Sequence, residues 1–188
     1  TQAVIEVERK WGNVTKLFPK QTLDVPIQPG THPEIDTTKF LEDDDVQIYQ
    51  SYVGVLRWAV ELGRIDLAHA AGVMARFSAA PRQGHLYGLL RIFAYCKKHL
   101  DSKVVFDTLE KNFENIEWVS HDWRQFYPDI KGEIYPPDQP KPRGRKIQVN
   151  LFCDAAHGSC HLTRRSTTSI IIFLNGAPIS WYSKRQNT

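Results

Sequence analysis

The sequence predicts an α+β protein in which a small helical bundle is followed by a three-stranded antiparallel sheet. Three amphipathic segments with the 3.6-residue period of helices lie within residues 46–100. Strand-like alternation of apolar and polar residues begins at Ile147, and two further strand-like runs follow it. A proline-rich stretch, residues 136–142, separates the two patterns. We therefore expect a stiff spacer between a helical unit and a sheet unit.

Composition limits the classes of protein to which the chain can belong. Of its 188 residues 41% are hydrophobic, which is enough for a packed core in one domain or two small ones. The net charge of +3 and the pI near 8.7 permit a nucleic-acid partner without requiring one. Three cysteines, an odd number, argue against a disulfide framework and favour a reducing compartment.

The ends of the chain and its apolar runs predict a piece of a longer protein outside the membrane. No apolar run approaches the ~20 residues that span a bilayer, and the N-terminus has no signal-peptide pattern. The chain begins without Met and ends after a strand-like run. We therefore expect further protein on both sides of it.

The N-terminal part predicts a short helix and an extended connector. Val4, Val7 and Trp11 have the spacing of one helix face, and a glycine follows as a C-terminal stop. Prolines interrupt residues 18–40, which we predict to be an extended loop. Acidic residues 42–45 lie at the start of a helix. Each well-placed negative charge there stabilises the helix by ~0.3–1 kcal/mol, through its interaction with the positive end of the helix dipole. Metal binding is the alternative for this run, but consecutive acids do not share a helix face.

Three helices are predicted between residues 46 and 100. Their expected buried side chains are Tyr49, Val53, Leu56 and Val60 in the first (46–62), Leu67, Ala70, Ala71, Met74 and Phe77 in the second, and Leu86, Leu89, Phe93 and Cys96 in the third. Asp66 is expected near the N-cap of the second helix and Pro81 at the first position of the third. Gly88 inside the third costs about 1 kcal/mol relative to Ala. The helices form a small bundle, and no apolar stripe needs a cofactor to explain it.

Residues 101–146 predict an irregular, proline-rich linker. Val104–Phe106 is a candidate short strand. Four aromatic residues are candidate anchors that attach the segment to a neighbouring surface: Trp118, Trp123, Phe126 and Tyr127. The stiff stretch 136–142 places the domain boundary just before the sheet.

Residues 147–188 predict three consecutive antiparallel strands. The first begins at Ile147 and ends at Asp154, whose side chain lies on the face opposite the mostly apolar set. The second is residues 167–174, and an Asn-Gly pair supplies the tight turn to a third strand at residues 179–182. The adjacent tryptophan and tyrosine of this third strand point to opposite sides, so at most one of them packs inward.

Motifs along nearly the whole chain resemble the polyprotein of copia-type retrotransposons. In the helical part the motifs are Tyr49-Gln50-Ser51-Tyr52-Val53-Gly54, Arg64-Ile65-Asp66-Leu67 with Ala75-Arg76-Phe77, and Pro81 and His85 with Leu90–Lys97. In the strand part they are Phe152-Cys153-Asp154-Ala155, Arg164–Ser169 and Pro178–Gln186. Their order along the chain makes the resemblance specific. The chain departs from the residues usual in the family at Tyr52, Ile65 and His157.

The resemblance implies four parts. Residues 1–45 would be the end of a reverse transcriptase palm with an extended connector, and residues 46–100 a helical thumb-like region. Residues 101–146 would be the irregular linker, and residues 147–188 the incomplete N-terminal part of a ribonuclease H-like domain. The implied fold is thus a thumb-like bundle followed by a truncated ribonuclease H-like sheet.

Asp154 matches the first-strand carboxylate of the ribonuclease H family. The resemblance implies that this carboxylate bridges two Mg²⁺ ions about 4 Å apart, one of which activates the attacking water while the other stabilises the leaving oxygen. The remaining acids of such a nuclease and the Tyr-x-Asp-Asp site of the polymerase are absent from the sequence. We therefore expect the chain alone to be inactive. The alternative for Asp154 is an ordinary exposed acid at a strand end.

Cys153, His157, Cys160 and His161 raise the alternative of a zinc site. Strand alternation points Cys153 away from Asp154, and the spacing does not match the usual zinc-finger or zinc-knuckle patterns. A small buried thiol and loop histidines are the preferred interpretation.

Basic residues gather in three places: Lys141, Arg143, Arg145 and Lys146; Arg164 and Arg165; and Lys184 and Arg185. These clusters fit contact with the phosphates of an RNA/DNA hybrid or a template–primer duplex, which sets affinity and register without reading sequence. The alternative is a solvated linker and hairpin face.

The resemblance therefore implies a fragment of an RNA-directed DNA polymerase and ribonuclease H polyprotein that grips a nucleic-acid duplex. Its partners would be that duplex and the rest of the polyprotein, the palm upstream and the remaining nuclease downstream, without a membrane. Such a protein would be cytoplasmic, in the virus-like particle of the element, or nuclear. The rival interpretation is a catalytically inactive remnant that only binds nucleic acid or protein. A third is a free nuclease completed by a partner chain.

Overall fold

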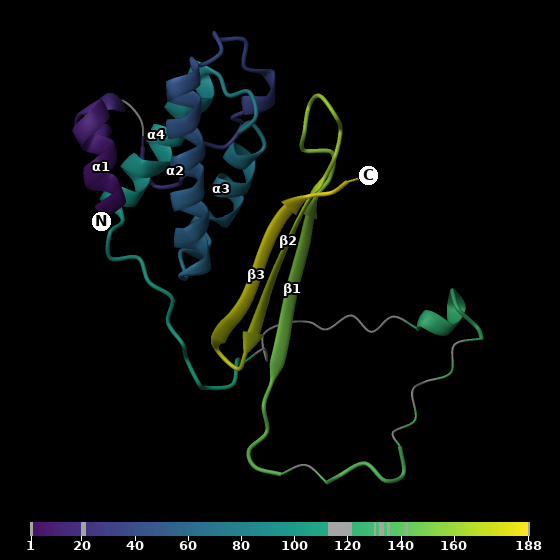
Figure 1. Cartoon of the computed structure of the whole chain (residues 1–188). Helices are drawn as coiled ribbons and strands as arrows, with labels where there is room; N and C mark the ends of the chain where they lie inside the picture. Colours follow the sequence, from purple (N-terminus) through teal and green to yellow (C-terminus); the bar gives the residue numbers. More distant parts are fainter. Residues whose placement is uncertain are drawn as a thin grey trace.

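The computed structural model shows a helical unit and a sheet unit that lie side by side (Figure 1). It describes residues 2–19, 22–112, 122–129, 131, 134, 136–141 and 143–187, with only the backbone at position 123. The helical unit contains α1 (Gln2–Trp11), α2 (Asp43–Glu61), α3 (Ala68–Ala75) and α4 (Gln83–Lys98). The sheet contains β1 (Val149–Ala156), β2 (Thr167–Leu174) and β3 (Ala177–Arg185). The α+β succession expected from the sequence is therefore present.

α1 forms as the apolar spacing predicts, so this short N-terminal helix and the three helices expected after it are all present. Val4 and Val7 are buried, and Gly12 ends the helix with a φ of +75°, a conformation that glycine adopts without steric cost. The connector that follows holds short 3-10 turns at Val14–Leu17 and Pro33–Ile35 and is otherwise irregular in its described residues. The predicted extended loop, residues 18–40, thus contains the 3-10 turn Pro33–Ile35.

α2 begins earlier than the apolar stripe predicts, because the acidic run belongs to the helix. Asp43, Asp44 and Asp45 occupy its first turn, so the acids lie at the positive end of the dipole as expected. One of them, Asp45, accepts a hydrogen bond of 3.0 Å from Lys10 on α1. The predicted buried set is confirmed, as Tyr49, Val53, Leu56 and Val60 are all buried.

Asp66 lies next to the N-cap of α3, Leu67, as expected, but it forms no cap, and the expected place of Pro81 is wrong. Asp66 does not cap α3, because a 3-10 turn, Ile65–Leu67, precedes this helix and the carboxylate binds Arg64 and Tyr95 instead. Pro81 lies before the N-cap of α4, which is Arg82, and so is not the first helical residue. At this end of α4 the ring of His85 accepts the backbone N–H of Arg82 through Nδ1 at 3.0 Å.

The predicted apolar faces of α3 and α4 are otherwise confirmed. Leu67, Ala70, Ala71, Met74, Leu86, Leu89, Phe93 and Cys96 are buried, whereas Phe77 lies beyond the end of α3 and is half-buried. The glycine inside α4 has a packing reason. A Cβ on Gly88 would lie 3.1 Å from the terminal methyl of Met74, so the glycine lets α3 approach α4 closely.

The three strands are antiparallel in the order β1-β2-β3, as predicted. β2 has the predicted bounds, while β3 is longer than residues 179–182 at both ends. β1 continues two residues past Asp154, so this aspartate does not end its strand. Asn175, with a φ of +52°, forms the turn from β2 to β3.

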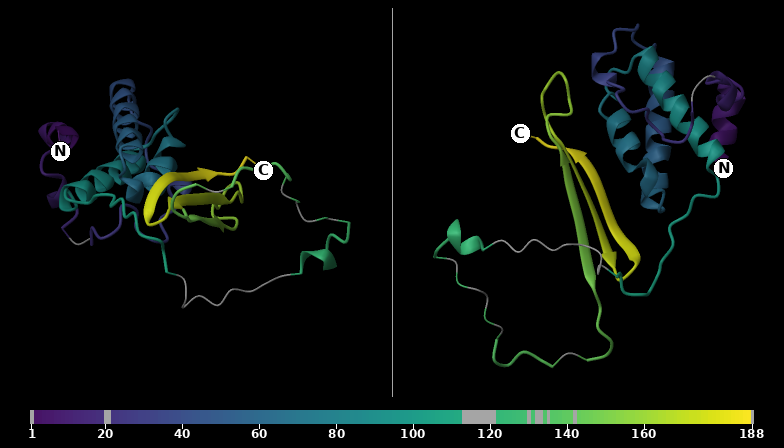
Figure 2. Two further views of the ribbon diagram at one scale, coloured as in Figure 1. Left: turned by 90° about the horizontal axis from the view of Figure 1, so that it is seen from below. Right: turned by 180° about the vertical axis from the view of Figure 1, so that it is seen from behind.

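The segment before the sheet contains no strand at Val104–Phe106, contrary to expectation. Only an isolated bridge between Asp107 and Gly176 forms there among the described residues, and the ring of Phe106 is exposed. Phe126 and Tyr127 are also exposed, which contradicts their predicted role as anchors. The segment that carries Phe126 and Tyr127 lies apart from the helical unit and the sheet (Figures 1 and 2). Trp118 and the side chain of Trp123 lie outside the described part of the chain.

The hydrophobic core of the described residues lies in the helical unit, and the sheet joins it through β3. Trp181 is the residue of β3 that packs against this core, and its indole Nε1 donates a hydrogen bond of 3.1 Å to the carbonyl of Val60. Tyr182 is 49% exposed. Of the two adjacent rings, the tryptophan therefore packs inward. No helix in the described part of the chain has the length and apolar character to cross a membrane.

Candidate functional site

Asp154 lies on β1 with its side chain exposed to solvent. Its cross-strand neighbour on β2 is Ser169, whose own neighbour on β3 is Ser183. The hydroxyls of the two serines are 3.4 Å apart, so both point to the same side of the sheet. Residues directly opposite in antiparallel strands share a face, and residues two apart on one strand do too. Asp154 therefore lies on the sheet face that also carries Trp181 and Arg185.

The described residues supply a single carboxylate at this position. β1, β2 and β3 contain no acid other than Asp154. Nowhere in the described ranges do three His, Cys, Asp or Glu side chains come together in a way that could hold a metal ion. Mg²⁺ is normally held by carboxylates together with water or substrate oxygens, and a pair of ions needs several acids. The residues present thus fit one ligand of such a site and not the whole of it.

The four residues that raised the zinc alternative are dispersed. Cys153 is exposed on the opposite sheet face from Asp154, whereas Cys160 is 2% exposed in the β1–β2 loop. The ring of His161 stacks on His32 with centroids 3.7 Å apart. Burial alone would raise the pKa of the Cys160 thiol, but hydrogen bonds from its loop and from Arg185 outweigh burial and lower it.

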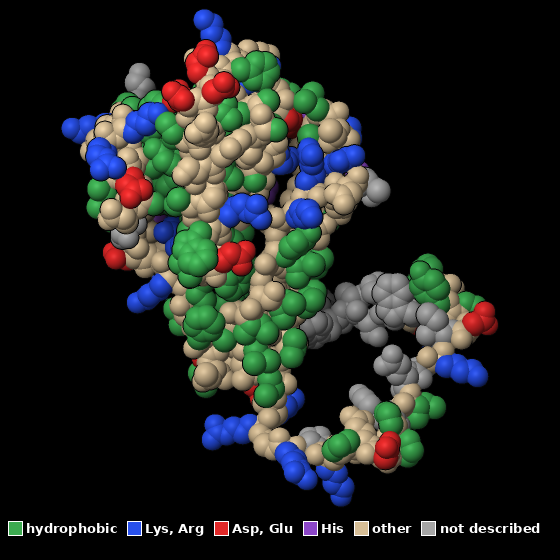
Figure 3. Space-filling view, viewed as in Figure 1, with side chains coloured by type: hydrophobic (Ala, Val, Ile, Leu, Met, Phe, Trp, Pro, Cys, Tyr) green, Lys and Arg blue, Asp and Glu red, His purple; other side chains and the backbone are tan. Residues whose placement is uncertain are grey.

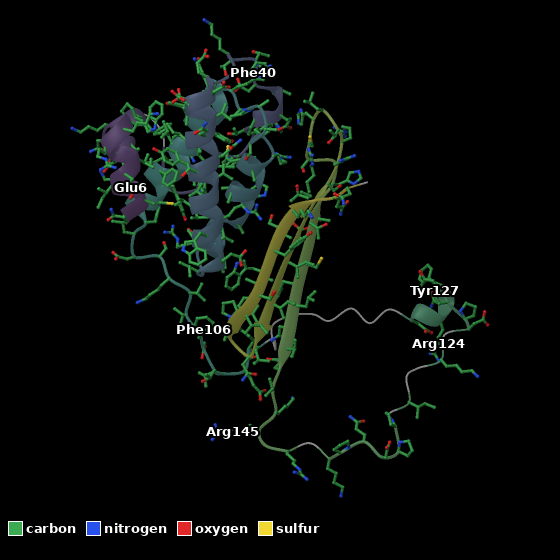
Figure 4. All side chains as sticks on the ribbon, in the orientation of Figure 1. Glu6, Phe40, Phe106, Arg124, Tyr127 and Arg145 are labelled. Atoms are coloured by element: carbon green, nitrogen blue, oxygen red, sulfur yellow. The ribbon has the colours of Figure 1, made fainter. Side chains whose placement is uncertain are left out.

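The first basic cluster lies on the segment that leads into β1. Lys141, Arg143, Arg145 and Lys146 are all exposed. Figure 4 labels Arg145 near the start of β1, away from the helical unit. These side chains project into solvent, as both the phosphate-contact interpretation and the solvated-linker alternative require.

The structure brings members of the other two basic clusters together. Arg165, Lys184 and Arg185 line a cleft of about 560 Å³ between α2, α3 and β3. Two further cations, Arg57 on α2 and Arg76 just after α3, line the same cleft. Basic side chains are visible where the helical unit meets the sheet (Figure 3). Arg164 lies outside the cleft lining, on the β1–β2 loop, with a φ of +55°.

Acids of the described chain offset the charge of the cleft cations only weakly, although the charge of Glu34 acts on Arg76. Glu61 is the single carboxylate among the lining residues. In the part of the chain that the structure describes, none of the five cations forms an ion pair with a carboxylate. Burial lowers the pKa of Arg76, and the nearby guanidinium of Arg185 lowers it further. Burial likewise lowers the pKa of His69, with a further contribution from Arg76.

Several residues of the copia-like motifs have structural roles in the helical unit. The hydroxyl of Tyr49 donates to the carbonyl of Met74 at 2.9 Å, and burial raises its pKa well above the ordinary value. The buried guanidinium of Arg91 donates to three connector carbonyls at 2.6–2.9 Å, those of Thr22, Val25 and Pro26. These side chains hold the bundle and its connector together.

Three other motif residues form a polar network on the surface of the bundle. The Asp66 carboxylate accepts from Arg64 at 2.8 Å and from the hydroxyl of Tyr95 at 2.9 Å. In the same unit His85 stacks on Phe77 and donates through Nε2 to the carbonyl of Pro33. The motifs thus mark residues that shape the fold. Arg76 is a motif residue that instead lines the cleft.

Sequence reasoning missed Arg57 and Arg76 as candidate site residues. Each is an isolated cation in the sequence, and no local pattern predicts that it meets Arg185 from a strand more than 100 residues away. The sequence signal that could have indicated Arg76 was its position inside a motif whose neighbouring residues have structural roles. The fold and its site therefore define an α+β protein with a basic cleft where a helical unit meets an antiparallel sheet.

In a comparison with known proteins, the chain is similar in sequence to a putative transposon protein. It is 24% identical over 141 residues to a putative transposon Ty5-1 protein of Saccharomyces cerevisiae, a match that covers 75% of this chain and 34% of that protein. It is also 24% identical over 166 residues to an uncharacterized mitochondrial protein of Arabidopsis thaliana, covering 88% of this chain and 53% of the relative. The chain thus spans about a third and about half of the length of these two relatives.

A third relative has a different description. The chain is 25% identical over 140 residues to a secreted RxLR effector protein of Plasmopara viticola, which covers 74% of each chain. No protein-family profile matches the chain, and no solved structure matches it. The similarity to the yeast protein supports a transposon origin.

Proposed function

We propose that the chain is a fragment of a retrotransposon RNA-directed DNA polymerase and ribonuclease H polyprotein, in which it grips the template–primer duplex and contributes the first metal-binding Asp of the nuclease. The similarity to a putative transposon protein supports this origin. The observation that carries the nuclease assignment is the place of Asp154, solvent-exposed on the first of three consecutive antiparallel strands.

In this proposal Asp154 supplies one carboxylate of a two-Mg²⁺ site, and the rest of the polyprotein supplies the others. The ions would provide charge stabilisation and an activated water in the parent protein. The chain itself holds the carboxylate on a paired strand, so its position is set by the register with Ser169. Because the described residues supply one such ligand only, we expect the chain alone to be inactive.

A titration with Mn²⁺, which binds the same oxygen ligands as Mg²⁺ and broadens nearby NMR signals, tests this role without requiring activity. Signals from the residues beside Asp154 on β1 should broaden first, and Asp154→Asn should remove the effect. Asp101→Asn, which changes an exposed acid outside the sheet, is the matched control. Equal broadening in the Asp154→Asn protein would refute the metal-ligand role.

Duplex gripping is assigned to the basic segment at Lys141, Arg143, Arg145 and Lys146, together with the other basic residues. All four side chains are exposed and can reach phosphates without desolvation. Changing the four to Gln should reduce the salt dependence of binding to an RNA/DNA hybrid by about three to four units of slope if each contacts one phosphate. The control removes four exposed cations elsewhere, at Arg9, Lys16, Lys39 and Lys103. An unchanged slope in the segment variant would leave it a solvated linker.

The second candidate function is a catalytically inactive remnant that serves only as a binding module. It is favoured by the single carboxylate on the described sheet and by the similarity to a secreted RxLR effector protein of Plasmopara viticola. The Mn²⁺ titration separates the two functions, since a remnant has no need to keep a metal ligand at position 154.

A further inference from the structure

We propose that the cleft between α2, α3 and β3 binds the phosphate backbone of a single nucleic-acid strand. This inference rests on the proposed function and adds to it a specific site and two residues, Arg57 and Arg76, that the sequence motifs did not mark as binding residues.

The charge of the cleft favours the binding of an anion from outside the described chain. Five cations from four parts of the fold converge on it: Arg57, Arg76, Arg165, Lys184 and Arg185. Glu61 is the single acid in the lining, and none of the five cations forms an ion pair within the described residues. Like charges brought together without acids destabilise a fold unless a counter-charge is bound. Phosphates, with several acceptor oxygens, are the natural partners of such guanidinium groups.

The size of the cleft selects one strand over a duplex. Its volume of about 560 Å³ is that of a small-molecule cleft, which typically measures ~300–1,000 Å³. A duplex is far wider, since its major groove alone measures about 12 Å across. A short stretch of one backbone therefore fits the cleft that α2, α3 and β3 border, where a duplex does not.

The position of the cleft relates it to Asp154. Ser183 lines the cleft, and two steps across the sheet, through Ser169, lead from it to Asp154. Strands are spaced by about 4.8 Å, so the two positions lie roughly 10 Å apart on one sheet face. A strand held in the cleft would therefore continue toward the carboxylate. The cleft would guide the strand that the nuclease of the parent protein cuts.

The experiment uses the full chain and a fluorescent single-stranded oligonucleotide, with binding measured over a range of salt concentrations. The test variant is Arg57→Gln with Lys184→Gln, because both side chains are exposed and their loss spares the core. The matched control is Arg9→Gln with Lys16→Gln, which removes the same charge on the α1 side of the bundle (Figure 1). A charge-preserving variant, Arg57→Lys with Lys184→Arg, reports whether charge alone is needed.

We expect the slope of log affinity against log salt to fall by about 1.4 in the cleft variant, at ~0.7 per lost phosphate contact on a single strand. The control and the charge-preserving variant should keep the original slope. Equal losses in the cleft variant and the control, or no loss in either, would overturn the proposal. Inorganic pyrophosphate that binds as tightly as the oligonucleotide would also overturn it, because the site would then be one for free phosphates.

The result is separable from the proposed function. Hybrid binding could depend on the basic segment at Lys141, Arg143, Arg145 and Lys146 while the oligonucleotide slope stays unchanged in the Arg57 and Lys184 variant. This result would refute the cleft proposal alone. If neither set of variants loses hybrid binding, the gripping role itself is contradicted.

Discussion

The indole Nε1 of Trp181 on β3 donates a hydrogen bond of 3.1 Å to the carbonyl of Val60, near the end of α2. These residues are 121 positions apart in the sequence, and their contact attaches the sheet to the helical unit. α3 lies beside the same strand, where a Cβ on Gly72 would be 3.4 Å from the carbonyl oxygen of Ser183. The cleft exists because these contacts hold β3 against the bundle.

Replacing this indole should weaken the attachment measurably. Trp181→Phe removes the hydrogen bond and part of the ring, so we expect the free energy of unfolding to fall by about 1–2 kcal/mol in urea denaturation. Tyr182→Phe, on the adjacent exposed ring, should change it by less than about 0.5 kcal/mol. Similar losses in the two variants would mean that the Trp181–Val60 contact does not anchor the sheet.

Asp154→Asn should leave the fold intact and should remove no catalytic activity of the isolated chain, which we expect to have none. The carboxylate is exposed and forms no ion pair among the described residues, so the free energy of unfolding should stay within about 0.5 kcal/mol of the original. Incubation of an RNA/DNA hybrid with Mg²⁺ should give no cleavage by either protein. Cleavage by the original chain that Asp154→Asn removes would contradict the prediction of inactivity.

Arg91 should be essential for the connector between α1 and α2. Its guanidinium reaches the carbonyls of Thr22, Val25 and Pro26, which would lose their donors on substitution. We expect Arg91→Met to lower the free energy of unfolding by about 2–4 kcal/mol, measured by urea denaturation. Arg9→Met, on the exposed face of α1, serves as the control and should be nearly neutral. A loss no larger than that of the control would rule out this role.

Asp66 should make stability depend on pH in the acidic range. Burial raises the pKa of its carboxyl, but the hydrogen bonds from Arg64 and Tyr95 outweigh burial and lower it. A carboxyl whose pKa is lower in the folded state stabilises the fold at pH values above its unfolded-state pKa of ~3.9. This contribution is lost as the pH falls through the lower folded-state pKa. The free energy of unfolding should therefore drop less steeply below about pH 4 in Asp66→Asn than in the original chain.

The variant Tyr95→Phe provides an internal check on that pH dependence. It removes one of the two hydrogen bonds to Asp66 and keeps Arg64, so the pH profile should lie between those of the original protein and Asp66→Asn. Profiles of equal steepness in all three proteins would show that the Asp66 network does not control acid stability.

Local patterns predicted those elements whose burial repeats regularly along the chain. The apolar stripe from Tyr49 to Val60 and the β-branched run of β2 both formed as expected, because each presents one continuous face to its neighbours. The run Val104–Phe106 has the same strand-like composition but pairs with no strand, so its side chains stay largely out of the core. Propensity does not make a strand without a partner.

Helix starts and side-chain partners were less predictable, because they depend on contacts distant in sequence. Asp66 had the residue type of an N-cap, but Arg64 and Tyr95 hold its carboxylate in another direction. The acidic run was expected at the start of a helix, but the apolar stripe alone did not predict that α2 begins at Asp43. The competing hydrogen bonds decide such positions.

The sequence by itself determined the succession of helices and strands, the alternation that separates Trp181 from Tyr182, and the strand that carries Asp154. Tertiary structure alone decided that Trp181 is the inward ring and that Arg57 and Arg76 share a cleft with Arg185. The physical reason is the distance along the sequence over which each feature is determined. Periodicity records which face of an element is apolar, whereas the meeting of like charges from separate elements depends on how those faces pack together.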